Sequence, residues 1–252
     1  IFYIGEHKAC FLRLKNKQLR KAKMKYLIQA MLISAILQIM VLSHGAETAN
    51  GISNDDLAAV SAKIRKEVPK EFVIIESSPF VVVGNLSNKD ITRFVEGTIQ
   101  SASNAFWKMY FDKKPDKVIT IFLFGDDESY RKYAKKLFGD EPTTPFGYFS
   151  PAENRLVMNI GTGGGTLVHE LFHALVRYDF PKIPDWTNEG MASLYEQCNI
   201  SNNKLKGLIN WRYPILMKHI KKGDCISLEN LIATKDSTFY TKDNGSNYAA
   251  TR

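Results

Sequence analysis

Apolar and polar positions between residues 55 and 138 switch between helical spacing and extended runs, which predicts three helices and three strands. In chain order, these are a helix at Asp55–Lys66, paired strands at Phe72–Glu76 and Phe80–Gly84, a long helix at Lys89–Phe111, a strand at Val118–Phe124 and a helix at Asp127–Phe138. The run at Val118–Phe124 is continuously apolar, as strands buried on both faces are. The long helix is therefore expected to pack on a sheet.

The remainder of the chain is predicted to be mainly helical after one hairpin. Two short strands, Gly147–Ser150 and Arg155–Ile160, flank turn residues at 151–154. The glycine-rich stretch 161–165 lacks the Gly-Lys-Ser/Thr of a phosphate-binding loop, so we interpret it as a flexible link into a helix. Helices are expected at Thr166–Tyr178, from Trp186 or Asn188 to Gln197, at Lys204–Lys221 and at Ser227–Ala233, with a loop at Lys235–Ser246 and a helical turn from Asn247.

Residues 1–45 differ in composition from the rest of the chain. They hold eight Lys or Arg residues, a single acid, Glu6, and the apolar run Tyr26–Leu42. A basic start, an apolar centre and small residues near position 45 form the pattern of a signal peptide, so we expect a signal at 24–45 and a secreted or periplasmic, cell-envelope protein. Residues 1–23 are interpreted as upstream read-through. An uncleaved N-terminal anchor is the alternative, because the apolar run is close to the length that spans a bilayer.

The charge of the chain changes once this leader is set apart. The whole sequence has a formal net charge of +8, but residues 46–252 hold 26 basic and 25 acidic residues. The basic excess belongs to the leader, so we expect no nucleic-acid partner and no membrane contact beyond the leader.

Cys198 and Cys225 lie 27 positions apart and fit no metal-binding spacing. A disulfide between them and two free thiols both stay open at this point.

The segment His169-Glu170-Leu171-Phe172-His173 has the residue types of a metal site. Its apolar neighbours recur at helical spacing, which predicts a helix buried on one side. Residues four apart in a helix differ by about 40° around the axis and about 6 Å along it, so both imidazoles can reach one ion at about 2.1 Å. Glu170 points about 100° away from His169, which suits a catalytic base that holds a metal-bound water.

A catalytic zinc ion needs a third protein ligand and an open position for water. Glu189 lies 16 positions after His173, at the start of the next predicted helix, and supplies this ligand. Gly190 and Ala192 are small enough to let that helix press close to the first. The predicted ligands of Zn²⁺ are therefore His169, His173 and Glu189.

The segments Gly165–Leu175 and Trp186–Ala192 resemble the gluzincin zinc metallopeptidases, especially the compact peptidase MA-like domains of secreted bacterial proteins. The second segment is also similar to the Trp-x-Asn-Glu-Gly block of zinc aminopeptidases. The resemblance implies an α+β, zincin-like metallopeptidase domain at 46–252, with a small mixed β-sheet, an active-site helix and a mainly helical C-terminal part. The last predicted helix stops after one turn at Arg252, which indicates a domain cut short at its C-terminus.

The resemblance also implies a reaction and the residues that serve it. The reaction is peptide-bond hydrolysis, with a zinc-bound water as nucleophile and Glu170 as general base. Glu196 is implied as the carboxylate that accepts a hydrogen bond from a ligand imidazole. This role also follows from chemistry, because zinc-bound histidines usually donate their second N–H to an acceptor. Ser193 is the competing candidate.

Substrate contacts follow from the same resemblance. In such families a strand at the rim of the cleft holds the substrate backbone by strand addition, and Arg155–Ile160 is predicted to be this strand. A Tyr or His stabilises the oxyanion; Tyr248 is the predicted residue, and Tyr240 and His219 are alternatives. The sequence lacks the Gly-x-Met-Glu-Asn motif that would bind a free substrate amine. We therefore expect an endopeptidase or oligopeptide hydrolase that acts on a peptide or protein substrate.

Two other functions fit the same motifs. A non-catalytic cell-envelope module on a gluzincin scaffold would bind a peptide or polymer, with or without its metal. Hydrolysis of a non-peptide amide is a third reading. The presence of Glu170 favours the enzyme, because a purely structural site has no use for that carboxylate.

Overall fold

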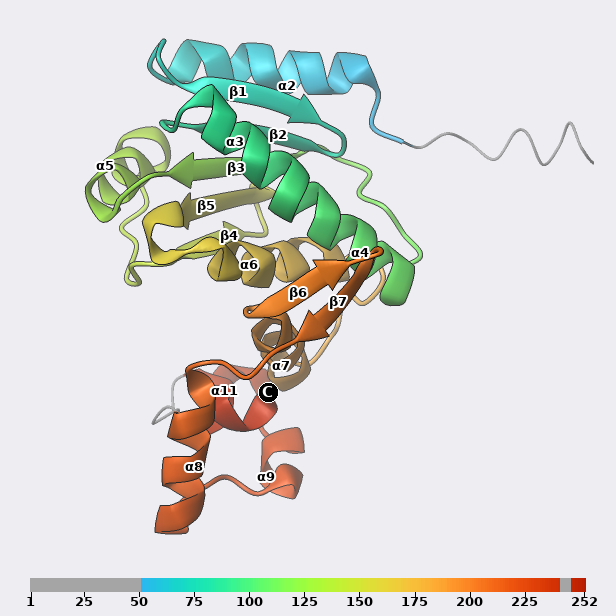
Figure 1. Cartoon of the computed structure of the whole chain (residues 1–252), viewed down its shortest axis with the longest axis vertical. Helices are drawn as coiled ribbons and strands as arrows, with labels where there is room; N and C mark the ends of the chain where they lie inside the picture. Colours follow the sequence, from blue (N-terminus) through green and yellow to red (C-terminus); the bar gives the residue numbers. More distant parts are fainter. Residues whose placement is uncertain (1–50, 241–245) are drawn as a thin grey trace, which may run out of the picture. The chain divides into compact units, whose positions relative to one another are not determined.

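The computed structural model describes residues 51–240 and 246–252 of the chain (Figure 1). Five strands form one sheet: β1 (Val73–Ser77), β2 (Phe80–Gly84), β3 (Ile119–Phe124), β4 (Gly147–Ser150) and β5 (Arg155–Asn159). Their order is β1-β2-β3-β5-β4, with β2, β3 and β5 parallel and the edge strands β1 and β4 antiparallel to their neighbours. The predicted strands and the mixed α+β class with a small mixed sheet are thereby confirmed.

Both faces of this sheet are buried, because successive side chains of a strand point to opposite faces. In β2, Phe80 and Val82 belong to the hydrophobic core on one face, whereas Val81 and Val83 belong to the core on the other. The side chains of β3 and β5 divide in the same way. The continuous apolar runs of the sequence thus supply two cores at once.

Helices cover the two faces. Leu57 of α2 (Asn54–Glu67) and Tyr130 of α5 (Asp127–Phe138) lie in one core. The helix predicted at Lys89–Phe111 contributes to the other core and is made of three stretches. These are α3 (Asn88–Phe94), the π-helical η1 (Val95–Gln100) and α4 (Ser101–Met109). Ser87 caps this helix by accepting a hydrogen bond from the backbone N–H of Asp90.

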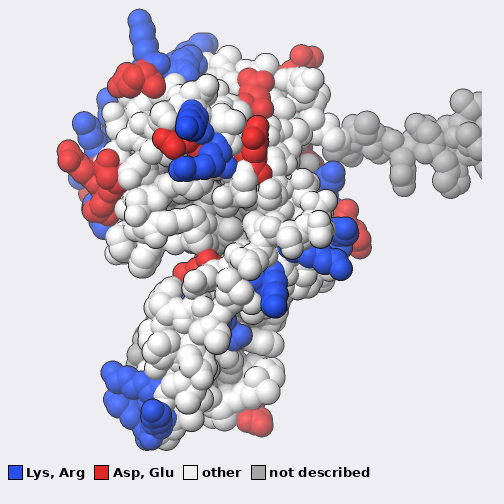
Figure 2. Space-filling model, viewed as in Figure 1, with Lys and Arg blue, Asp and Glu red and all other residues white. Residues whose placement is uncertain are grey.

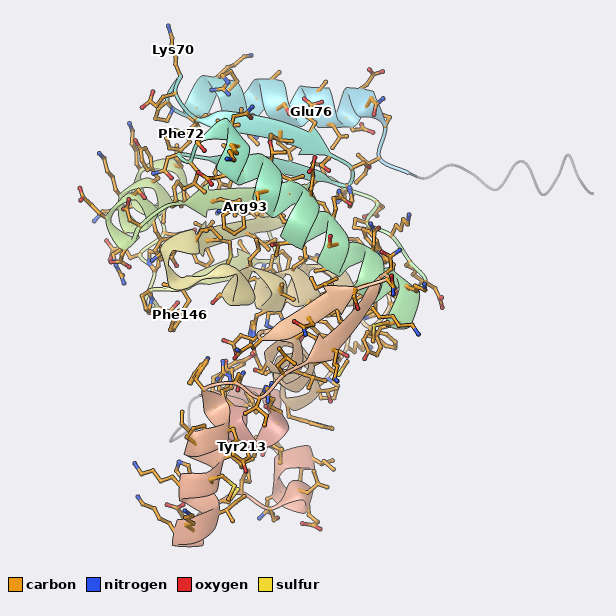
Figure 3. All side chains as sticks on the ribbon, viewed as in Figure 1. Lys70, Phe72, Glu76, Arg93, Phe146 and Tyr213 are labelled. Atoms are coloured by element: carbon orange, nitrogen blue, oxygen red, sulfur yellow. The ribbon has the colours of Figure 1, made fainter. Side chains whose placement is uncertain are left out.

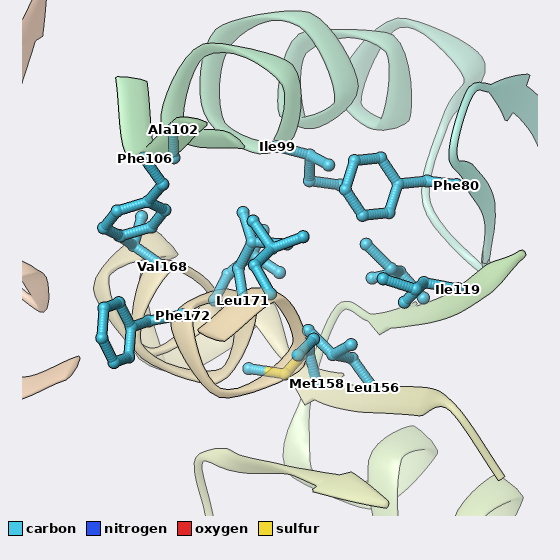
Figure 4. Close-up of a cluster of buried hydrophobic side chains, with 14 of the residues drawn as sticks. Phe80, Ile99, Ala102, Phe106, Ile119, Leu156, Met158, Val168, Leu171 and Phe172 are labelled. Atoms are coloured by element: carbon cyan, nitrogen blue, oxygen red, sulfur yellow. The ribbon is translucent and has the colours of Figure 1, made fainter. Parts of the chain in front are cut away.

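The helix that carries the metal-site motif, α6 (Gly164–Val176), lies in the same core as α4. Figure 4 shows Leu171 and Phe172 of α6 pointing towards Phe106 and Ile99. The rings of Phe106 and Phe172 meet edge to face, with centroids 5.4 Å apart. Because Leu171 is fully buried and Phe172 is 1% exposed, the rotation of α6 about its own axis is fixed. The next helix, α7 (Asp185–Tyr195), matches the helix predicted from Trp186 or Asn188.

The helix predicted at Lys204–Lys221 is wrong over its first residues. A two-stranded antiparallel hairpin, β6 (Cys198–Ser201) and β7 (Lys204–Gly207), occupies this part of the chain, and helix α8 spans only Arg212–Lys222. The hairpin turns at Asn202 and Asn203, with φ values of 52° and 54°. A two-residue turn of this type needs positive φ at both positions, and asparagine tolerates this conformation better than most residues do.

The C-terminal part is mainly helical, as predicted, with α9 (Leu228–Ile232), α10 (Asp236–Phe239) and α11 (Ser246–Thr251) after α8. The loop predicted at Lys235–Ser246 is partly wrong, because it contains the single turn α10; residues 241–245 lie outside the described residues. Gly190 of α7 does not face α6. A Cβ atom there would lie 2.5 Å from the carbonyl oxygen of Thr251, so this glycine admits α11 instead.

The surface and the cysteines add little to the functional picture. On the face drawn in Figure 2, positive and negative side chains are interspersed over the sheet and its helices, and blue side chains gather at the end of α8, which carries Lys221 and Lys222. Cys198 and Cys225 are free thiols, which decides between the two alternatives. Within 51–240 and 246–252, no helix combines the length and the apolar character that a bilayer crossing requires. The leader predicted at 1–45 lies outside the described residues.

Candidate metal centre

Helix α6 brings His169 and His173 to one face, as the spacing predicts. The two rings lie 4.8 Å apart between centroids and are nearly perpendicular. The opposite side of α6 is fixed in the core by Leu167, Leu171 and Leu175. His169 is buried, at 7% exposure, and His173 is half-buried, so each ring has little freedom to turn away from its neighbour.

Helix α7 brings the third donor to the same point. Oε2 of Glu189 lies 3.2 Å from Nε2 of His169, and Oε1 lies 3.6 Å from Nε2 of His173. Ligand atoms of the three residues all lie within 4.8 Å of one another. Donors about 2.1 Å from one tetrahedral ion lie about 3.4 Å from each other. The two carboxylate–imidazole separations are therefore close to the tetrahedral value, and the three predicted ligand residues form a group that could hold a metal ion.

Gly165 allows α6 and α7 to approach each other closely enough for this convergence. A Cβ atom at position 165 would lie 2.1 Å from the carbonyl oxygen of Glu196, which follows the last residue of α7. Any larger residue would push the end of α7 away from the start of α6. The glycine-rich stretch read as a flexible link is thus a packing contact, and α6 begins at Gly164, two residues before the predicted start.

Asn188 orients one of the two imidazoles. Its side-chain oxygen Oδ1 lies 2.8 Å from Nδ1 of His173. Because an amide oxygen only accepts hydrogen bonds, Nδ1 is the donor and carries a proton, so that Nε2 is left to face Glu189. Metal-binding histidines are commonly held by an acceptor at their second nitrogen. This role of Asn188 was not predicted from the sequence, although Asn188 lies next to Glu189 in the Trp-x-Asn-Glu-Gly segment.

Glu196 does not hold an imidazole. Its Oε2 accepts hydrogen bonds from Nε of Arg212 at 3.0 Å and from Nδ2 of Asn210 at 3.4 Å. The guanidinium of Arg212, at the start of α8, engages the carboxylate that the prediction assigned to a histidine. Nδ1 of His169 and Oγ of Ser193 are both buried without a hydrogen-bond partner among the described residues. The structure thus pairs neither Glu196 nor Ser193 with a ligand histidine.

The electrostatics of the three donors favour a positive charge between them. Burial acts to raise the pKa of Glu189, but the imidazoles of His169 and His173 beside its carboxylate hold this pKa well below its usual range. Burial likewise disfavours the charged form of His173, but the adjacent Glu189 carboxylate outweighs burial and raises the pKa of His173 to about 9. A proton or a metal cation can supply the positive charge, since both neutralise the buried carboxylate.

Two tyrosines reach the site from the C-terminal part. Oη of Tyr240 donates a hydrogen bond of 2.9 Å to Oε1 of Glu189, so this residue supports a predicted ligand. Tyr248 lies next to it, with ring centroids 6.2 Å apart. His219, the third residue considered for the oxyanion, bonds to Asp224 at 2.9 Å and lines no hollow beside the metal-site residues. The two tyrosines are the candidates that the structure brings to the site.

The donors open into a hollow of about 660 Å³ beside the sheet. His169, Glu170, His173 and Glu189 line it together with both tyrosines. Tyr148 and Phe149 of β4 also line the hollow, whereas β5 lies between β3 and β4. The choice of Arg155–Ile160 as the rim strand is therefore wrong. The edge strand is β4, because its partner β5 is enclosed on its other side by the parallel strand β3.

A further hollow lies beyond the imidazoles, at the start of β4 near Gly147. This second hollow of about 370 Å³ also contains His169, Glu170 and Tyr248, and it extends to Phe146 and Trp211. The two hollows together flank the predicted metal ligands. Comparison of the chain with models of known protein families and with curated protein sequences gives no match.

Proposed function

We propose that this chain is a zinc-dependent peptidase of gluzincin type. The observation that carries the proposal is the convergence of His169, His173 and Glu189 at separations of 3.2 and 3.6 Å, beside a hollow that Glu170 also lines. Two imidazoles and one carboxylate suit zinc, which takes three protein ligands in catalytic sites. The resemblance of the α6 and α7 segments to gluzincins supports the same choice, together with a zincin-like arrangement of the domain.

The three donors would hold the metal, which when bound would polarise the substrate carbonyl and make water more acidic. Glu170 follows His169 on α6 and faces the same hollow. In the proposed reaction, this carboxylate accepts a proton from the attacking water and returns it to the leaving amine. Tyr248 lines both hollows beside the metal-site residues and is the proposed donor to the oxyanion.

The edge strand β4 supports a peptide as the substrate. No other strand of the described part of the chain pairs with the outer edge of β4. An extended peptide can add to such an edge through backbone hydrogen bonds, which suits substrates of varied sequence. We propose that the substrate lies along Gly147–Ser150 and crosses the metal ligands. We also propose export of the protein, on the pattern of residues 24–45.

The test is to measure metal content and cleavage of a mixed peptide library for the purified chain and three variants. Glu170→Gln should keep the metal and lose hydrolysis by about two to four orders of magnitude. Glu189→Ala should lose the metal itself. Glu128→Gln is the matched control, because this exposed residue lies in the first turn of α5. Unchanged turnover in Glu170→Gln would remove Glu170 from the reaction. Metal and peptide binding without hydrolysis in the parent chain would instead support a binding module.

A further inference from the structure

Arg177 is the one Lys or Arg residue among the described residues that line the metal-site hollow. It follows His173 by four positions and is the C-cap residue of α6, where its backbone still has helical angles. Residues four apart lie on the same side of a helix, one turn along. The guanidinium therefore continues the row formed by His169 and His173 towards one end of the hollow.

Contacts within the protein hold this guanidinium in place without neutralising it. Nη1 donates a hydrogen bond of 2.8 Å to the carbonyl oxygen of Pro151, just after the end of β4. The guanidinium carbon also lies 5.7 Å from the ring centroid of Phe149 and 5.9 Å from that of Tyr178. Within 51–240 and 246–252, no carboxylate forms an ion pair with Arg177. The other four N–H donors of the guanidinium form no hydrogen bond among the described residues.

The other carboxylates that line the hollow are Glu170 and Glu189. Their two negative charges offset the charge of a bound divalent cation, so Arg177 is the positive charge that no described group of the hollow neutralises, and it attracts an anionic group of a substrate. The second hollow, at the other side of the metal-site residues, differs in charge. Phe146 and Trp211 line it and are 44% and 53% exposed, and its one guanidinium among the described residues, that of Arg212, is already paired with Glu196 at 3.0 Å. Figure 3 shows Phe146 below the sheet. The two ends of the cleft therefore differ in charge.

Helix geometry gives the distance from the reacting bond. Arg177 is six residues beyond the midpoint between His169 and His173, which corresponds to about 9 Å along α6. An extended peptide advances about 3.3 Å per residue. We propose that Arg177 binds a carboxylate of the substrate two or three residues from the scissile bond, and this inference rests on the proposed peptidase function. The guanidinium donates two parallel N–H···O hydrogen bonds to the carboxylate, as arginine does in bidentate pairs.

Two sources can provide this carboxylate, and the direction of β4 distinguishes them. β4 runs towards Pro151 and so towards Arg177. A peptide antiparallel to β4 places its N-terminal half beside Arg177, where only an Asp or Glu side chain can be the ligand. A peptide parallel to β4 places its C-terminal half there, where the terminal carboxylate can bind as well.

The experiment measures peptide binding in place of turnover. Fluorescein-labelled short peptides carry one glutamate at successive positions of an uncharged Ala, Ser and Gln background, with the C-terminus amidated. Matched peptides replace that glutamate by glutamine, and a third set has glutamine and a free C-terminus. Binding is followed by fluorescence anisotropy to the full chain carrying Glu170→Gln, so that no peptide is cut. We expect the best glutamate peptide, or the free acid, to bind about tenfold more tightly than its neutral match.

Variants assign the preference to Arg177. Arg177→Gln should bring the ratio close to one, and Arg177→Lys should keep part of it, because lysine retains the charge but not the planar fork. Arg93→Gln is the control: Arg93 lies on α3, is labelled in Figure 3, and pairs with Asp90 at 3.2 Å. This control should keep the tenfold ratio. Raising the salt concentration should reduce the ratio in the parent chain.

The outcomes separate the inference from the proposed function. A preference for internal glutamate identifies an acidic side chain, and a preference for the free acid alone identifies the chain end. Equal binding of all three peptide sets by the Glu170→Gln chain overturns the inference even if the chain that also carries Arg177→Gln does not fold, and so does an unchanged ratio in a folded Arg177→Gln chain. Hydrolysis by the unaltered chain, with no charge preference in binding, refutes the Arg177 site alone, whereas charge preference in binding, with no hydrolysis by the unaltered chain, refutes only the peptidase.

Discussion

Replacing Asn188 by alanine tests how the site orients its proposed metal ligands. The change removes the acceptor that lies 2.8 Å from Nδ1 of His173 and leaves a half-buried N–H without its protein partner. The imidazole can then rotate about the Cβ–Cγ bond, and Nε2 no longer faces Glu189 in a fixed direction. Loss of such a supporting contact weakens metal binding by about ten- to hundredfold, which corresponds to about 1.4–2.7 kcal/mol.

The assay is a competition for zinc between the protein and a chromophoric chelator at fixed pH. Asn188→Asp should bind zinc at least as tightly as the parent chain, because its carboxylate accepts the same hydrogen bond and adds negative charge. Asn199→Ala, at an exposed position of β6, should leave the affinity unchanged. Equal zinc affinity for Asn188→Ala and the parent chain would show that His173 needs no support from this amide, and the role assigned to Asn188 would be refuted.

Two further predictions concern the same helices. With the metal removed by a chelator, the His173–Glu189 contact should stabilise the fold fully between about pH 4.5 and 6.5, which are the ordinary pKa values of the two groups. The stabilisation is lost as the pH rises through the raised pKa of His173, near 9. It is also lost as the pH falls below 4.5 towards the lowered pKa of Glu189. The difference in melting temperature between the parent chain and His173→Gln, measured from below pH 4.5 to above pH 9, follows this stabilisation, and a constant difference over that whole span contradicts the argument. Gly165→Ala should cost about 1–3 kcal/mol in denaturant unfolding and weaken zinc binding, because the new methyl group meets the carbonyl oxygen of Glu196. Gly97→Ala is the control, since a Cβ atom there contacts nothing within 4 Å; equal losses at the two positions would show that the close approach does not matter.

The sequence predicts the sheet strands and α6 well because their signals are local. The run Val118–Phe124 is long and continuously apolar, and β3 forms at Ile119–Phe124. The spacing of His169 and His173 fixes their common face as soon as the helix forms. The convergence with Glu189 was also predictable, because only 15 residues separate it from His173 and the two helices are consecutive.

The errors arise where the outcome depends on distant partners. Strand order is one case: β5 becomes an inner strand because it pairs with β3 from much earlier in the chain, and no pattern within Arg155–Ile160 reveals this. Glu196 is another, since Arg212 from the following helix engages it. The hairpin of β6 and β7 was missed although Asn202-Asn203 is a local turn signal, because the apolar residues after Lys204 also fit helical spacing.

The shortness of β4 has a consequence for the behaviour of the protein at high concentration. An open strand edge recruits any extended chain, including the same edge of a second molecule, and such self-association would bury the cleft of both copies. β4 has four residues and is followed by Pro151, which has no N–H to donate. Few backbone hydrogen bonds can therefore form along this edge. A second molecule that pairs with this edge is accordingly held weakly, and association through β4 should be reversible and should not produce fibrils.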